Sequence, residues 1–375
     1  MSMSSDARRV ALGAMQHAPG WADVLIPWSG MDSGPAPVPQ AAEPTLVSAI
    51  ASAWRAQTAD GPVGPGEGPD DVSRETWARP VDDTPLARAA ATAVQVRSGH
   101  AGALRRPPAT RVVAVTNQKG GVGKTTSTVN LAAALAVQGL RVLVMDLDPQ
   151  GNASTALSVD HQINVPSSYD VLVAGASIAA VVAPVKDIPG LWCVPATLDL
   201  AGAEIELVSR VAREHLLRKA ITKYLTDHAR RYDRFDYVLI DCPPSLGLIT
   251  VNALVAADEV LIPIQCEYYA LEGLGQLLRT VDLVRDNLSP TLYVSTILLT
   301  MFDARTRLAA QVAEEVRRHF GDKVLPTAIP RSVRLSEAPS YGQTIMTYDP
   351  GSSGALSYLE ASRELNRAGI GGGDR

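Results

Sequence analysis

One glycine-rich stretch, Asn117-Gln-Lys-Gly-Gly-Val-Gly-Lys-Thr-Thr126, holds the side chains best suited to chemistry in this chain of 375 residues. Glycines let backbone N–H groups close on phosphate oxygens, and a helix starting there adds the positive end of its dipole. Lys124 is placed to reach the β- and γ-phosphates of a nucleotide, and the Thr125 hydroxyl is placed to ligate Mg²⁺. The loop therefore predicts a Mg²⁺–ATP site whose other phosphate-binding residues are Gly120, Gly121, Val122, Gly123 and Thr126.

The loop departs from the ordinary P-loop because Gln118 stands where the first glycine is expected and Lys119 follows it. A lysine at that point cannot easily fold back onto its own phosphates. It can cross a subunit interface and neutralise charge on a partner's nucleotide, as arginine fingers do. Residues 111–116 before the loop predict a strand and residues 127–138 predict a helix, the context that a phosphate-binding loop requires. We therefore expect Lys119, like Lys124, to be catalytic and to bind ATP.

Three acidic residues follow two further buried-type strands. Asp146 and Asp148 come after the run 141–145, and Asp241 comes after the run 237–240. In an open parallel sheet ligands bind at the carboxyl ends of the strands, so these acids are expected in one site. Asp241 is expected to hold the Mg²⁺ shell, mainly through water, with help from Asp146, and Asp148 is expected to orient the attacking water. Taken singly, each acid could instead be a strand-end turn or cap.

The hydrophobic pattern predicts alternating strands and helices over most of the chain. The strands are expected at 111–116, 141–145, 191–194, 237–240, 259–264, 292–299 and 324–328. The helices are expected at 124–138, 150–157, 168–174, 204–230, 246–256, 270–287, 306–320, 334–339 and 352–367. Such alternation predicts an α/β fold with a mostly parallel, doubly wound sheet of about seven or eight strands, covered by helices on both faces.

Several separate strings resemble the ParA/Soj chromosome-partitioning proteins, a P-loop ATPase group with a deviant Walker A loop related to MinD. They are the glycine loop, residues 146–152, 241–245, 263–273, 300–306 and 329–339, and the resemblance extends over about residues 109–366. It implies an ATPase with slow intrinsic turnover and an ATP-bound homodimer. It also implies non-specific binding of double-stranded nucleoid DNA, release stimulated by a ParB-type centromere-binding protein, and a cytoplasmic, nucleoid-associated location.

The resemblance also assigns residues near the C-terminus. Arg305 and Arg334 are the expected DNA-binding residues, with ion pairing inside the fold as the alternative. Pro330 and Arg331 are expected on the adenine side of the nucleotide, with a plain turn as the alternative. A net charge of −5 argues against binding DNA by composition alone, so any such contact must be local and salt-sensitive.

Composition divides the chain into three parts. Residues 1–108 are rich in Pro, Gly and Ala, lack lysine and are expected to be a mostly disordered extension. Residues 109–367 are expected to be the ATPase domain, and residues 368–375 a flexible tail. Four of the five tryptophans lie in the extension, which indicates either a docking arm, for example for a polar scaffold protein, or an inert tail. The three cysteines have no metal or redox spacing and are expected to be buried free thiols.

Two other functions fit parts of the pattern. A MinD-like membrane ATPase would require a basic amphipathic C-terminal helix, whereas this sequence ends in a glycine-rich tail, so no membrane insertion is expected. A nucleotide-shaped scaffold that acts through the N-terminal arm is the second alternative. No apolar run reaches the ~20 residues needed to span a bilayer.

Overall fold

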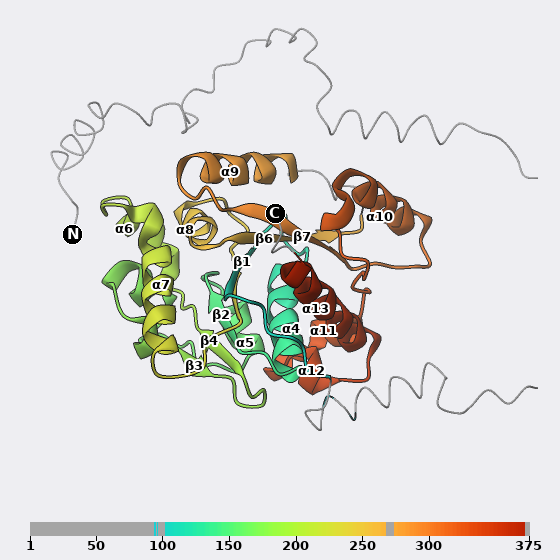
Figure 1. Ribbon diagram of the computed structural model, residues 1–375, viewed down its shortest axis with the longest axis horizontal. Helices are drawn as coiled ribbons and strands as arrows, with labels where there is room; N and C mark the ends of the chain where they lie inside the picture. Colours follow the sequence, from blue (N-terminus) through green and yellow to red (C-terminus); the bar gives the residue numbers. More distant parts are fainter. Residues whose placement is uncertain (1–93, 95, 97–101, 268–273, 372–375) are drawn as a thin grey trace, which may run out of the picture. The chain divides into compact units, whose positions relative to one another are not determined.

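The computed structural model describes residues 94, 96, 102–267 and 274–371 (Figure 1). Nearly all of the predicted extension 1–108, and the last four residues of the predicted tail, lie outside this part of the chain. The extension meets the domain at a few described points. Val96 is buried in the core, the Leu104 amide donates to the carbonyl of Gln138, and Arg106 contacts Asp236 at 2.8 Å.

A seven-stranded sheet with the order β3-β4-β2-β5-β1-β6-β7 forms the centre of the fold (Figure 1). All neighbouring strands pair in parallel except β3 with β4. The strands are β1 Arg111–Val115, β2 Val142–Asp146, β3 Ala183–Pro184, β4 Leu191–Val194, β5 Tyr237–Asp241, β6 Glu259–Gln265 and β7 Tyr293–Thr300. The predicted fold class is confirmed.

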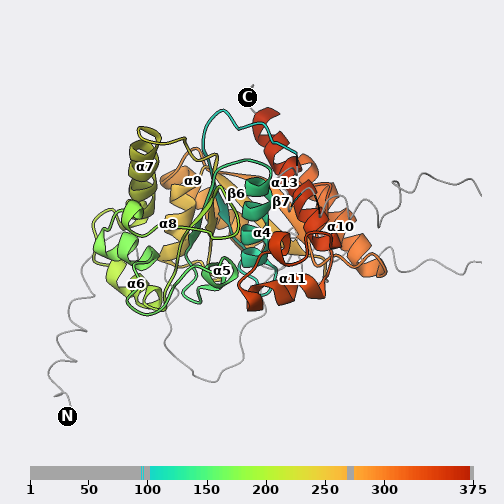
Figure 2. The ribbon, with the colours of Figure 1, turned by 90° about the horizontal axis from the view of Figure 1, so that it is seen from below.

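Helices cover both faces of the sheet, as Figure 2 shows from a second direction. One core cluster contains side chains of α6, α7, α8, α9 and α10, and the other contains those of α4, α5, α11, α12 and α13. Their bounds are α4 Lys124–Val137, α5 Asn152–Ala156, α6 Leu200–Leu207, α7 Leu216–Ala229, α8 Leu248–Ala256, α9 Leu274–Asn287, α10 Arg307–Phe320, α11 Val333–Glu337, α12 Ile345–Tyr348 and α13 Ser353–Gly371. Short π- or 3₁₀-helical turns lie at Asp170–Ala174, Ile178–Ala180, Arg213–His215, Gly321–Lys323 and Ala338–Tyr341.

The central strands and the first helix are buried because of their composition. β1, β2 and β5 are buried at every residue, and they consist mainly of β-branched and aliphatic side chains, which suit a sheet covered on both faces. α4 follows the glycine loop directly, and its small alanine side chains let it pack closely between the sheet and α13. The glycine loop is thereby held at the carboxyl edge of the sheet.

Three sequence-based expectations about secondary structure were wrong. Residues 324–328 form no strand and only one bridge, between Val324 and Ile297, because Pro326 has no N–H to continue the ladder. The helix expected at 204–230 is broken between α6 and α7, where Ala212 has a φ of 52°. The short antiparallel strand β3 was not predicted.

Two expectations drawn from composition can also be compared with the structure. All three cysteines, Cys193, Cys242 and Cys266, are free and buried, as predicted. Within the described residues, no helix combines the length and the apolar character that crossing a membrane requires.

Candidate functional site

The glycine loop is fixed by its backbone and by two side-chain tethers. Gly121 and Gly123 have φ values of 73° and 86°, a left-handed conformation that costs glycine least. The Nδ2 of Asn117 donates to the carbonyl of Pro263 in β6 at 2.8 Å. The hydroxyl of Thr300, at the end of β7, donates to the carbonyl of Val122 at 2.8 Å. The loop is therefore held to two strands besides the one that leads into it.

The two lysines of the loop lie in different surroundings. Lys124 is 7% exposed, and its Nζ lies 3.4 Å from the carbonyl oxygen of Lys119. Burial lowers the pKa of Lys124, although the nearby carboxylates of Asp241 and Asp148 oppose that change. The side chain of Lys119 is one-third exposed, and its Nζ lies 4.0 Å from the Oε2 of Glu267. Lys124 therefore lies within its own loop, whereas Lys119 extends toward the end of β6.

Two buried carboxylates face each other at the carboxyl ends of β2 and β5. Asp146 and Asp241 are register partners, and both are fully buried. Asp146 accepts hydrogen bonds from the amide of Asp148 and from both the amide and the hydroxyl of Ser154. Burial is the main cause that raises the pKa of Asp146 to about 6 and that of Asp241 to about 8, and their mutual repulsion raises the pKa of Asp241 further.

The environment of Asp241 fits a magnesium ion. Its Oδ1 accepts a 3.0 Å hydrogen bond from the Thr128 hydroxyl, while its Oδ2 is buried without a hydrogen-bond partner among the described residues. The Thr125 hydroxyl also stabilises the ionised form. No group of three or more His, Cys, Asp or Glu side chains in the described part of the chain could hold a metal alone. Mg²⁺ commonly keeps several waters and binds through one or two protein oxygens plus phosphate, so this donor set is sufficient.

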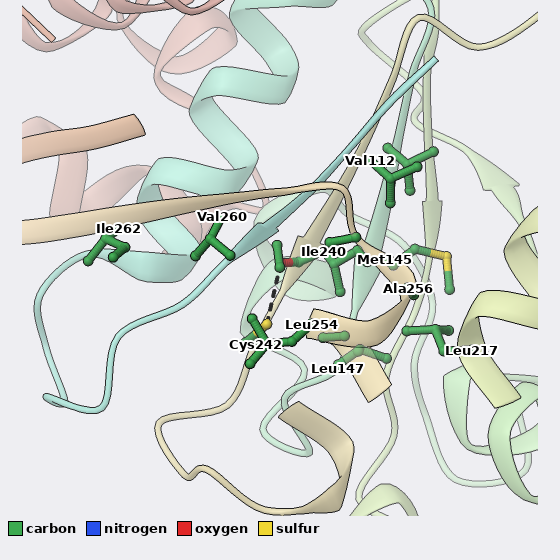
Figure 3. Close-up of a cluster of buried hydrophobic side chains, with 14 of the residues drawn as sticks. Val112, Met145, Leu147, Leu217, Ile240, Cys242, Leu254, Ala256, Val260 and Ile262 are labelled. Atoms are coloured by element: carbon green, nitrogen blue, oxygen red, sulfur yellow. Dashed lines mark hydrogen bonds between the residues drawn. The ribbon is translucent and has the colours of Figure 1, made fainter. Parts of the chain in front are cut away.

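An apolar layer lies directly beneath these acids. Figure 3 shows Cys242, the residue after Asp241, among Ile240, Leu254 and Leu147. The Cys242 thiol donates to the carbonyl of Ile240 at 3.7 Å, and burial raises its pKa well above the ordinary value. Cys242 is therefore a neutral packing residue, and the charge at this edge of the sheet belongs to the acids and Lys124.

Asp148 lies at the start of the turn that leads into α5. Its side chain is 8% exposed, and its Oδ1 accepts a 3.0 Å hydrogen bond from the amide of Gln150. The sequence left a strand-end turn or cap as the alternative role of Asp148, and this hydrogen bond is such a turn contact. Asp148 is also close enough to Lys124 to stabilise the charge of its ammonium group.

Arg305 and Arg334 are exposed, and both form ion pairs within the domain. The guanidinium of Arg305 donates to both carboxylate oxygens of Asp303, at 2.9 and 2.8 Å, although its side chain is 88% exposed. Arg334 lies 3.6 Å from Glu337 and 3.7 Å from Asp349. The intramolecular pairing foreseen as an alternative is therefore present for both residues, and it leaves both accessible to solvent.

Pro330 and Arg331 continue alongside the end of β7. Pro330 bridges to Phe302, and the Arg331 amide donates to the carbonyl of Phe302 at 3.1 Å. Arg331 is exposed. These backbone contacts hold the two residues at the same edge of the sheet as the glycine loop.

Several residues that support the site were not singled out from the sequence. Thr128 lies one helical turn after Lys124, a spacing that places both on one face of α4, and this signal was available. Asn117 and Thr300 act through contacts distant in the chain, which no local pattern reveals. Ser154 lies only eight residues after Asp146, whose carboxylate it contacts. Glu267 pairs with Lys119 across almost 150 residues.

Comparison with known proteins finds a matching family model and several similar proteins. A family model described as an AAA domain matches residues 110–294. The Soj protein of Bacillus subtilis, named a sporulation initiation inhibitor, is 52% identical over 255 residues, which are 68% of this chain and 98% of that protein. The chromosome partitioning protein ParA of Caulobacter vibrioides is 50% identical over 256 residues, 68% of this chain and 93% of that protein.

One solved structure similar to this chain contains bound ligands. It is described as cobyrinic acid a,c-diamide synthase from Mycobacterium smegmatis with a bound ATP analogue and magnesium. It is 39% identical and superimposes with a TM-score of 0.59 over 69% of this chain and 95% of that one.

Proposed function

The chain belongs to the ParA/Soj family of chromosome-partitioning P-loop ATPases, and from this premise we propose that ATP binding and dimerisation are one event that controls its hold on DNA. The observation that carries the proposal is the separation of the two loop lysines. Lys124 Nζ is enclosed by the loop, 3.4 Å from the Lys119 carbonyl, while the Lys119 ammonium extends toward Glu267. One lysine is thus suited to the chain's own nucleotide, and the other is suited to a nucleotide on a second copy.

Within one subunit the loop residues bind the nucleotide. Backbone amides of residues 120–126 and the Lys124 ammonium bind phosphate oxygens, and Pro330 and Arg331 contact the adenine side. Thr125, Asp146 and Asp241 would hold Mg²⁺, which would supply charge stabilisation at the transferring phosphoryl group. The buried Oδ2 of Asp241 has no other partner, which supports this assignment. Thr128 and Ser154 orient the two carboxylates through their hydroxyls.

Lys119 acts across the interface. The contact between its Nζ and Glu267 is long, at 4.0 Å, and both side chains are partly exposed, so little free energy holds them together. A phosphate group of a second subunit can therefore replace the Glu267 carboxylate. Two nucleotides would then lie between two subunits related by a two-fold axis, the closed arrangement most common in homo-oligomers.

Hydrolysis is proposed to be slow in the absence of a partner. Asp148 is the residue placed to orient the attacking water, but one of its oxygens is already engaged by the amide of Gln150. A carboxylate that positions water without accepting its proton contributes modestly to catalysis. A ParB-type centromere-binding protein would stimulate the step and separate the dimer. The chain would thereby act in the cytoplasm, on the nucleoid.

DNA binding is proposed to involve Arg305 and Arg334. Both guanidinium groups are exposed and already positioned by acids of the same domain, so exchanging a carboxylate for a phosphate oxygen needs little rearrangement. Dimerisation doubles the number of such contacts, which raises the affinity steeply without any new contact in one subunit. The binding is expected to be independent of DNA sequence and to weaken with salt.

The test is retention on DNA, measured with ATP, ADP and no nucleotide over a salt series, for wild type and for Arg334→Ala. Arg285→Ala is the control, because Arg285 is a partly exposed arginine paired with acids on α9. Retention confined to the ATP state, and lost in Arg334→Ala but kept in Arg285→Ala, supports the proposal. Equal retention with ADP and ATP would contradict it.

A further inference from the structure

The solvent face of α7 carries an excess of positive charge, which acids of the fold compensate only in part. Residues 216–231 contain Arg218, Lys219, Lys223, Arg230 and Arg231, against the single acid Asp227. Leu217 packs into the core, as Figure 3 shows, and Ile221 and Tyr224 on the same side are buried. The basic side chains are on the exposed side of the helix.

Ion pairing distinguishes this face from three other exposed arginines of the domain. Arg305, Arg318 and Arg334 each pair with carboxylates of their own segment. On α7, Arg230 lies 3.7 Å from Asp227, whereas Lys219 and Lys223 form no ion pair with any described residue. Because they are four residues apart, these two ammonium groups lie one turn from each other on the same face and repel one another. An acidic partner would relieve that repulsion.

Exposed apolar side chains lie in the segments that precede and follow α7, and we call them the apolar border. The segment that leads into α7 exposes Ile205 by 81%, Val208 by 61% and Val211 by 92%. Tyr232, just beyond the end of the helix, is 65% exposed. A partner that complements this surface therefore combines acidic residues with at least one large apolar side chain.

Residues 60–83 of the same chain have that composition. They contain seven acidic residues and two arginines, together with Trp77. Tryptophan can pack on exposed aliphatic groups and can also lie over a lysine ammonium. The acidic residues Asp70 and Asp71 are adjacent, as are Asp82 and Asp83.

The point at which the extension joins the domain is compatible with this pairing. Arg106 bonds to the carboxylate of Asp236 and to the carbonyl of Arg234, and Arg234 in turn bonds to the carbonyl of Pro107. These contacts lie just beyond the C-terminal end of α7. Twelve residues lie between Asp83 and Val96, and the thirteen steps along the chain can span up to about 43 Å when extended. Val96 packs in the core cluster of α4 and α13, on the other face of the sheet from α7, so this connection must pass around the edge of the sheet. α7 itself is about 21 Å long.

We propose that the acidic segment 60–83 docks on the basic face of α7 within the same chain, with Trp77 against the apolar border. A free polyanion such as DNA carries the same charge, but the segment is tethered, which gives it an effective concentration in the millimolar range. Docking places carboxylates over Lys219 and Lys223. It thereby keeps nucleic-acid phosphates off this side of the domain.

Cysteine cross-linking in the full chain tests the docking. Ser73→Cys in the segment is combined with Thr222→Cys on α7, since Thr222 is exposed and the three native cysteines are buried. The control pair replaces Thr222→Cys by Ala310→Cys on α10, which lies far from α7 in both views (Figures 1 and 2). We expect the α7 pair to cross-link at monomer mass at least several-fold faster than the α10 pair.

Charge reversal decides whether the interaction is specific. Lys219→Glu with Lys223→Glu should reduce the cross-linking rate to that of the control pair, and adding Asp70→Lys with Asp71→Lys should restore it. Equal rates for the α7 and α10 pairs, products only at dimer mass, or a rate insensitive to charge reversal would overturn the proposal. If the reversal weakened DNA retention and left cross-linking unchanged, the face would be a nucleic-acid surface instead.

Discussion

The Nζ of Lys124 lies 3.4 Å from the carbonyl oxygen of Lys119. The backbone of Lys119 therefore contacts the ammonium group of Lys124, at the other end of the glycine loop. This contact fixes the spacing between the two residues while leaving the Lys119 side chain free of the loop. The geometry explains why two lysines five positions apart need not compete for one phosphate. Each mutation of this pair should therefore have a different consequence.

Replacing Lys124 by alanine removes the ammonium group that the loop encloses. We expect ATP hydrolysis to fall by at least about 10²-fold, the effect typical of losing one donor to a developing charge. Nucleotide binding should weaken as well. Lys323→Ala is the matched control, since Lys323 is an exposed lysine outside the site. A Lys124→Ala variant with normal turnover would show that the loop does not bind the reacting phosphates.

Thr300→Val tests the tether between β7 and the glycine loop. The substitution keeps the shape of the side chain and removes the hydroxyl that donates to the Val122 carbonyl at 2.8 Å. Nucleotide affinity should fall by about 2- to 10-fold, which corresponds to one net hydrogen bond. Thr300→Ser retains the hydroxyl and should bind nucleotide nearly normally. Calorimetric titration measures both, and equal losses in the two variants would assign the effect to packing.

The pair Asp146 and Asp241 should make the nucleotide-free chain lose stability as pH rises. Burial raises the pKa values of these groups in the folded chain to about 6 and about 8, above those of an unfolded chain. Their contribution to stability is complete below the unfolded pKa and is lost as pH rises through the folded values. The midpoint of thermal unfolding should therefore fall from about pH 4 to about pH 8, where the folded chain keeps protons that the unfolded chain has lost, and level off above that. The fall should be smaller in Asp241→Asn. Mg²⁺ with ADP should oppose the loss, because a cation stabilises the ionised carboxylates.

An identical pH dependence in wild type and Asp241→Asn would show that other groups cause it. Asp322→Asn, a change at an exposed acid on the turn after α10, controls for the loss of one negative charge.

A buried ion pair at the opposite edge of the sheet should affect stability rather than catalysis. Arg111 in β1 binds both oxygens of Glu259 in β6, at 2.7 and 2.6 Å, and also the carbonyl of Leu365 in α13. Arg111→Met leaves the Glu259 carboxylate buried and unpaired, at a cost of about 3–5 kcal/mol. The double variant Arg111→Met/Glu259→Leu should recover most of that loss. Chemical denaturation measures both, and a double variant no more stable than Arg111→Met would contradict the reasoning.

The sequence predicted the sheet well because its central strands are short, continuous apolar runs, and such runs favour strands that are buried on both faces. β4 matches its predicted range, and β1, β2 and β5 match within one residue at each end. The family expected from the motif strings is confirmed by the relatives at about 50% identity. The failures have local causes, namely Pro326 in the predicted last strand and Ala212 in the predicted long helix.

The site was predictable only where a local sequence pattern marks each residue. Lys124 and Thr125 follow from the loop spelling, and Asp146 and Asp241 from their positions at strand ends. The ionic partner of Lys119 and the tether from Thr300 depend on β6 and β7 folding back beside β1, which no local pattern encodes. The roles assigned to all of these residues, and to Asp148, Arg305, Arg334, Pro330 and Arg331, remain predictions.

The most direct test of the account is the mass of the ATP-bound species in solution. Sedimentation of Asp148→Ala, which should hydrolyse ATP poorly, is compared with sedimentation of Asp148→Ala/Lys119→Ala at saturating ATP and Mg²⁺. The account predicts a dimer for the first and a monomer that still binds ATP for the second. A dimer that persists without Lys119, or an ATP-loaded Asp148→Ala chain that stays monomeric at high concentration, would contradict it.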